Sequence, residues 1–82
     1  MNTVTKLLVL ARHAATGYFG VLSTGEKLAA ALILNRPDWL ADMNYTLADA
    51  IWRVGPEWLR DIPAAAEQFD AESPTSEARR GD

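Results

Sequence analysis

The sequence predicts an all-α protein: a compact bundle of four to five short helices, made of an N-terminal helix and two stacked helical hairpins. Three observations predict this fold class. Apolar residues recur at intervals of three and four along most of the chain, which is typical of amphipathic helices. Capping signals precede several of these stretches. After residue 22, no stretch sustains the alternation of apolar and polar residues that a half-buried strand requires.

The first apolar stretch predicts a helix over residues 3–19, with Thr3 as its N-terminal cap. Residues 4–10 are also rich enough in β-forming side chains to make a strand, so helix and strand both stay open for residues 3–10. Gly17 and Gly20 weaken the end of the stretch and predict a turn.

Capping residues predict where the later helices begin. Ser23 and Glu26 have the spacing of a capping box, and Thr46 starts a second capping signal. Between them, Pro37 suits the first turn of a short helix, where its missing N–H costs nothing. Asn44 is a suitable residue to end that short helix.

The helix after Thr46 carries an apolar stripe that we expect to be buried. It consists of Leu47, Ala50, Ile51 and Val54. Gly55 and Pro56 restart the chain, and a further stripe continues to Phe69, although Pro63 should kink this last helix or split it in two. Residues 71–82 contain no large apolar side chain, which predicts a disordered tail after a single helical domain over residues 1–70.

The chain repeats itself at an offset of nineteen residues. Residues 28–43 and 47–62 share seven identities and three similar pairs over sixteen positions, including a common Pro-acid-Trp-Leu-x-Asp. The repeat predicts two consecutive helical hairpins that stack on each other, with the N-terminal helix as a lid. Duplication and convergence on the same helix-start chemistry both account for it.

The size of the chain limits its core. Eighty-two residues form one domain near the lower limit for a self-sufficient core, and the chain has no cysteine. Many of its apolar residues are alanine, so the three tryptophans should supply much of the buried surface. Trp39 and Trp58 occupy equivalent positions in the repeat and are predicted to lie in the core. Trp52 lies off its helix's stripe and is predicted to be exposed or interfacial.

Charge is unevenly distributed along the chain. Residues 1–36 hold four basic residues and one acidic residue, whereas residues 37–72 hold eight acidic and two basic residues. Solvated helix faces and an acidic surface that binds a basic partner both explain this distribution.

The segment LLVLARHAATG, residues 7–17, resembles the start of the histidine phosphatase family, an apolar strand followed by Arg-His-Gly-Glu-Thr. The resemblance implies a phosphate-accepting His13 and a phosphate-binding Arg12. It covers about ten residues and then ends: Ala14 and Ala15 replace the family's Gly and acid, and the chain has a single histidine where the family needs two.

Helical hairpins also raise the possibility of a nucleic-acid-binding regulator that uses the basic N-terminal region. The second helices of the two hairpins offer acids where a recognition helix offers Arg, Lys, Gln or Asn. Such helices would repel the phosphate backbone, so a nucleic-acid partner is the weaker alternative.

The sequence therefore predicts a small non-enzymatic protein, of adaptor or inhibitor type, that binds another protein, with self-association as one form of this binding. We expect no cofactor, no metal site and no catalytic residue, because no nucleophile–base pair or ligand spacing is present. No apolar run is long enough to span a bilayer, and we expect a cytoplasmic protein. The candidate partner-binding residues are Trp52, Arg53, Asp49, Arg60 and Arg36.

Overall fold

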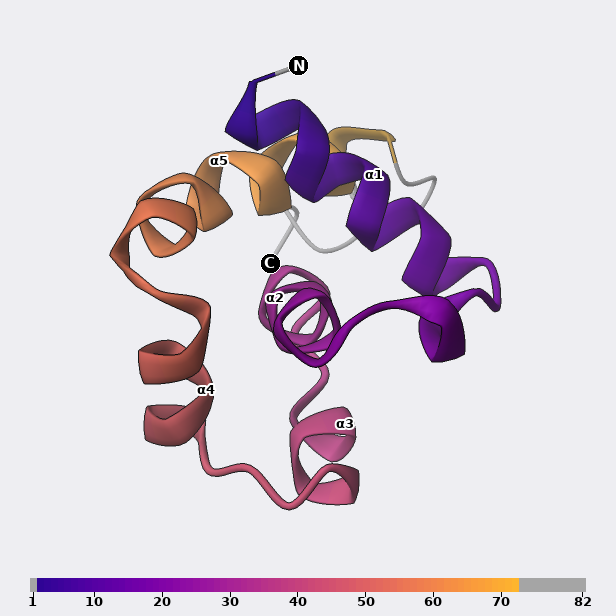
Figure 1. Cartoon of the computed structure of the whole chain (residues 1–82). Coiled ribbons are helices and arrows are strands. Elements are labelled where there is room, and N and C mark those ends of the chain that lie inside the picture. Colours follow the sequence, from indigo (N-terminus) through magenta and orange to yellow (C-terminus); the bar gives the residue numbers. More distant parts are fainter. Residues whose placement is uncertain (1, 73–82) are drawn as a thin grey trace, which may run out of the picture.

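A computed structural model describes residues 2–72 of the chain, and all of its regular structure is helical. Five α-helices and one 3₁₀ turn follow one another along the sequence (Figure 1). Their bounds are α1 Thr3–Ala15, η1 Phe19–Val21, α2 Thr24–Ile33, α3 Pro37–Asp42, α4 Leu47–Val54 and α5 Pro56–Glu72. The predicted all-α fold class is confirmed.

Helix α1 starts and ends differently from the prediction. Its cap is Asn2 rather than Thr3: the Asn2 side chain accepts a hydrogen bond of 2.8 Å from the Thr5 amide. Residues 3–10 are helical, which resolves the choice between helix and strand. The helix ends at Ala15 rather than at residue 19, because Gly17 adopts a φ of 98° that breaks the helical path.

Helices α2 and α3 begin and end where the local signals predict. Ser23 and Glu26 form a complete capping box at the start of α2. Asn35, with a φ of 55°, turns the chain after α2, and Pro37 then occupies the first turn of α3. Asn44, with a φ of 63°, ends α3.

Helix α5 continues as one unit through Pro63. Pro63 was expected to kink or split the helix, and it does not split it. Because a proline inside a helix removes only one main-chain hydrogen bond, packing along the rest of α5 can hold the helix together. The helix ends at Glu72, so Ala71 and Glu72 are helical rather than part of the predicted tail, and residues 73–82 lie outside the described residues.

The core has two parts that meet on α2. One part joins α1, α2 and α5 and consists of Leu7, Leu10, Ala11, Ala29, Ile33, Ile62 and Ala65. The other joins α2, α3 and α4 and consists of Leu28, Ala31, Leu40 and Ala50. Figure 1 shows α2 nearly along its axis in the middle of the molecule, with the other helices around it. Helix α1 therefore contributes fully buried side chains to the core rather than covering a finished one.

The two repeat units form α2–α3 and α4–α5, but their environments differ. Both second helices start at a proline, Pro37 and Pro56. The turns differ, because three residues separate α2 from α3 whereas Gly55 alone separates α4 from α5. The equivalent first-helix leucines also differ: Leu28 is fully buried and Leu47 is 58% exposed.

Candidate functional site

Helix α4 is fixed at both ends by local interactions. The Thr46 hydroxyl accepts a 3.0 Å hydrogen bond from the Asp49 amide, and the Asp49 carboxylate accepts one of 3.4 Å from the Thr46 amide. At the other end, Gly55 reverses the chain with a φ of 91° and a ψ of 160°. These caps stabilise α4 without requiring both of its sides to be buried.

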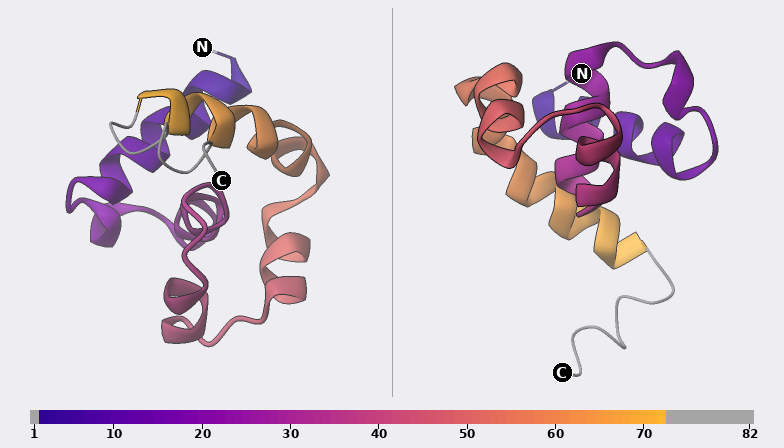
Figure 2. Two further views of the ribbon diagram at one scale, coloured as in Figure 1. Left: turned by 180° about the vertical axis from the view of Figure 1, so that it is seen from behind. Right: turned by 90° about the horizontal axis from the view of Figure 1, so that it is seen from below.

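The outer side of α4 is apolar and exposed. Leu47 is 58% exposed, Ile51 41% and Trp52 84%, and Ala48 beside them is also exposed. At 3.6 residues per turn these four side chains fall within an arc of about 140° on one side of the helix. We call these four residues the α4 face. In Figures 1 and 2, no other described element covers the outer side of α4.

The prediction that Leu47 and Ile51 are buried is therefore wrong. Only Ala50 of α4 is fully buried, and Val54 is half-buried. Helix α4 lies at the edge of the bundle, so only the narrow side that carries Ala50 and Val54 meets the core around α2. The periodicity of the sequence identified the apolar stripe of α4, but it did not show how much of that stripe the rest of the fold covers.

A hollow of about 260 Å³ adjoins the N-terminal end of the α4 face. Leu47 belongs to both, which makes the face and the hollow one continuous apolar surface. The walls of the hollow come from the end of α2, from α3 and from the connection to α4. They are lined by Ala31, Leu32, Asn35, Arg36, Pro37, Leu40, Ala41, Tyr45 and Leu47.

Three of the five predicted partner-binding residues lie together on α4. Trp52 is the most exposed large apolar residue of the described chain, as predicted. Asp49 and Arg53 are exposed and lie one helical turn apart, on the side of α4 away from Leu47 and Ile51. The Arg53 guanidinium also reaches over the start of α2, where its Nη1 lies 3.6 Å from the position of a Cβ on Gly25.

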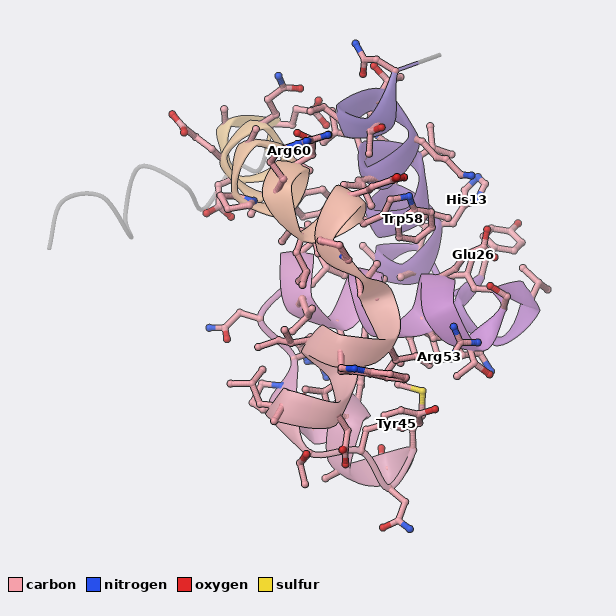
Figure 3. The ribbon with its side chains drawn as sticks, turned by 60° about the vertical axis from the view of Figure 1, so that its left-hand side comes forward. His13, Glu26, Tyr45, Arg53, Trp58 and Arg60 are labelled. Atoms are coloured by element: carbon pink, nitrogen blue, oxygen red, sulfur yellow. The ribbon has the colours of Figure 1, made fainter. Side chains whose placement is uncertain are left out.

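The other two predicted residues lie elsewhere. Arg36 caps α3 and lines the hollow, and its guanidinium pairs with Asp38 at 2.7 Å. Arg60 is exposed on α5, and Figure 3 shows it well apart from Arg53. The structure therefore joins Arg36 to the same surface through the hollow but does not bring Arg60 to it. Sequence reasoning missed Leu47 and Ile51 as surface residues, and no local signal distinguishes them from core residues.

Trp39 and Trp58 are half-buried rather than fully buried, in contrast to the prediction. Each packs against the margin of one part of the core. Each also lies beside a cation: Arg36 is 4.5 Å from the centre of the Trp39 ring, and the Lys6 ammonium is 5.2 Å from that of Trp58. Leucine and alanine, not tryptophan, form the fully buried core.

The shifted pKa values have structural causes. Hydrogen bonding to the Ser23 amide lowers the pKa of Glu26 in the capping box of α2. The hydrogen bonds of the Arg12–Glu72 ion pair, at 2.6 Å, lower the pKa of the Glu72 carboxyl and raise that of Arg12. The Arg36–Asp38 pair has the same effect on its two groups.

The phosphatase-like segment does not form a phosphate site among the described residues. It is helical rather than a strand, and Arg12 is paired with Glu72. His13 is exposed and packs edge-on against Tyr18 at 6.2 Å between ring centres. Arg12 and His13, which the resemblance would assign to phosphate binding, therefore make contacts between α1 and other parts of the fold: Arg12 with Glu72 of α5, and His13 with Tyr18 after α1.

Two further properties concern residues 2–72 only. Within this range, no group of three or more His, Cys, Asp and Glu side chains is placed to hold a metal ion. None of the helices in this range has the length and apolar content to cross a membrane.

Over the described residues, the fold and the α4 face define a small all-α protein with an exposed apolar helix face. No protein-family model, curated protein or solved structure matches the chain.

Proposed function

We propose that this chain is a small, non-enzymatic, adaptor- or inhibitor-type protein that binds another protein through the α4 face. One observation carries the proposal: Trp52 is 84% exposed and shares one side of a capped helix with Leu47 and Ile51. Contiguous exposed apolar side chains of this kind mark interaction sites on soluble proteins. Tryptophan is also among the residues enriched in interface hot spots.

The surroundings of the face support the same function. Asp49 lies next to Trp52 on α4 and Arg36 lines the adjoining hollow, so charged side chains adjoin the apolar ones as in the polar rim of a protein interface. The hollow beside Leu47 offers a concave site for a side chain of the bound protein. The perturbed titratable groups belong to a helix cap and to two surface ion pairs, so they give no support to a catalytic role.

Capture of interacting proteins tests this proposal. The tagged chain, its Trp52→Ser variant and its Val21→Ser variant are each used as bait in a lysate of the source cells. Val21 is 77% exposed on η1, away from α4, so its variant is a matched loss of exposed apolar surface. We expect Trp52→Ser alone to lose the captured protein. Equal capture by all three baits would refute the role of the α4 face.

The arrangement of basic side chains weighs against the nucleic-acid alternative. Of the four cations in residues 1–36, Arg12 and Arg36 are held in ion pairs. Lys6 and Lys27 lie over aromatic rings. Nucleic-acid affinity depends largely on cations available to phosphates. We expect no retention on immobilised DNA at low salt, and salt-dependent retention would revive this alternative.

A further inference from the structure

We propose that α3 and α4 form a flap, residues 37–54, that opens away from α2 while α1, α2 and α5 stay folded. Opening uncovers a side of α2 that the closed fold hides, so the flap controls how much apolar surface the chain exposes. Two features of the fold carry this inference: the division of the core and the distribution of hydrogen bonds. Neither feature depends on what the α4 face binds.

The core is divided unequally between the flap and the rest of the fold. The part that joins α1, α2 and α5 takes all of its buried side chains from those three helices, so it is complete without the flap. In the other part, two of the four buried side chains, Leu40 and Ala50, belong to the flap. They pack against Leu28 and Ala31 of α2. Half-buried flap residues at the margin of this part are Trp39, Met43, Tyr45 and Val54.

Hydrogen bonds do not fasten the flap to the helices around it. Within residues 2–72, no hydrogen bond or ion pair joins the flap to α1, α2 or α5. The side-chain hydrogen bonds of the flap lie within it or join it to Arg36, the residue immediately before it. By contrast, the Arg12–Glu72 ion pair joins α1 to α5. Opening therefore breaks apolar contacts but no hydrogen bond to these three helices.

Two further contacts border the flap and are lost or loosened when it opens. The Trp39 ring packs on Phe19 of η1, with 4.5 Å between ring centres. Val54, at the end of α4, borders both parts of the core. Units held by few buried contacts open at a lower free energy than the whole chain unfolds. We therefore expect the flap to open before the three remaining helices separate.

The flap lies between two residues with a left-handed backbone. Asn35, with a φ of 55°, follows α2, and Gly55, with a φ of 91°, precedes α5. Residues between helices can change φ and ψ and so swing a whole element without breaking a helix. Figure 1 shows α3 and α4 below α2, with α1 and α5 above it. The flap thus occupies one side of the molecule, bounded by a possible hinge at each end.

An open flap changes the surface of α2. Leu28 and Ala31 are at most 2% exposed in the closed fold and lie on the side of α2 that meets the flap. Ala29 of the same helix belongs to the part of the core shared with α1 and α5. Opening uncovers Leu28 and Ala31 and leaves Ala29 buried. A molecule that binds the uncovered side of α2 shifts the population toward the open form.

Buried thiols on α2 test the flap, because the native chain has no cysteine. Ala31→Cys and Ala29→Cys form a matched pair, since both positions are buried on one helix and face different parts of the core. A soluble thiol reagent labels each folded variant, and each rate is divided by that of the same variant unfolded in urea. We expect Ala31→Cys to react at least about tenfold faster than Ala29→Cys. Equal rates, or faster labelling of Ala29→Cys, overturn the flap.

Hydrogen exchange provides a second test that needs no thiol. Ala65→Gly weakens the part of the core that the flap does not complete, and should speed exchange of the buried amides of α1 roughly five- to thirtyfold. The hydrogen-bonded amides of α3 and α4 should keep their native rates, because flap opening leaves the contacts of Ala65 intact. Equal acceleration in α1 and α4 would show a single cooperative unit and overturn the flap.

The same exchange data test whether α3 and α4 move together. We expect the slowest amides of the two helices to report one shared opening free energy, as in a cooperative unit. Clearly different values for α3 and α4 would show that the helices open separately, which overturns the flap as a single element.

Discussion

Leu28 and Leu47 offer a direct test of the fold, because they are the same residue at equivalent positions of the repeat. Leu28 is fully buried on α2, whereas Leu47 is 58% exposed on α4. Leu28→Ala removes about three carbon groups from the core, or roughly 2.4 kcal/mol at about 0.8 kcal/mol each. The cavity left behind raises the expected loss to about 3 kcal/mol.

This loss is large for a chain of this length. Eighty-two residues give a free energy of unfolding of roughly 4–12 kcal/mol. A loss of about 3 kcal/mol should lower the Tm by roughly 12–24 °C in a domain of this size. Leu47→Ala removes the same groups from a mostly solvated position and should cost less than about 1 kcal/mol. Thermal unfolding followed by circular dichroism, at a concentration where the chain is monomeric, measures both. Equal decreases in Tm would refute the assigned environments of α2 and α4.

Three further predictions follow from individual positions. Gly55→Ala should destabilise the fold by about 1–3 kcal/mol, because Gly55 has a positive φ. Gly20→Ala, with open space around the added methyl group, should be neutral or stabilise the fold by up to about 1 kcal/mol. Urea unfolding compares the two variants, and equal changes in the free energy of unfolding would contradict the turn geometry. The Glu26 carboxylate, with its lowered pKa, stabilises the fold above the ordinary value of 4.5, and this contribution disappears as pH falls through the lowered pKa. Glu26→Gln should therefore differ from the native chain at pH 7 and approach it near pH 3, and a difference that persists at low pH would argue against this origin. Trp58→Ala should lower the free energy of unfolding by about 3 kcal/mol, because Trp58 is half-buried. Trp52→Ala should change it by less than about 0.5 kcal/mol, because Trp52 is mostly exposed. Similar losses for both variants in chemical denaturation would contradict their different burial.

The parts of the fold that the sequence predicts well depend on interactions within a few residues. The Ser23–Glu26 and Thr46–Asp49 capping boxes are examples, because each is complete within one helical turn. Asn44 likewise ends α3 through its own backbone conformation. Such features need no information about the rest of the bundle, so a single sequence is sufficient to locate them.

The larger errors concern interactions between distant parts of the chain. The end of α1 is a smaller and local error, because the apolar pattern continues past Gly17, the glycine that stops the helix. The burial of Leu47 and Ile51 is the larger error. Their spacing is correct for a core stripe, but whether a stripe is covered depends on where the helix lies in the bundle. Trp52 was predicted to be exposed because it lies off that stripe, whereas the α4 face as a whole required the structure.

The internal repeat explains why α4 has an apolar side that the rest of the fold leaves exposed. Helices α2 and α4 share the Leu-Ala-x-Ala pattern, but α2 lies in the centre and contributes to both parts of the core. Helix α4 lies at the edge, so the same pattern buries Ala50 and leaves Leu47 in solvent. A protein bound on the α4 face would give α4 what α2 already has, which is apolar contact on two sides. The repeated sequence thus provides one helix for the core and an equivalent helix for the proposed binding face.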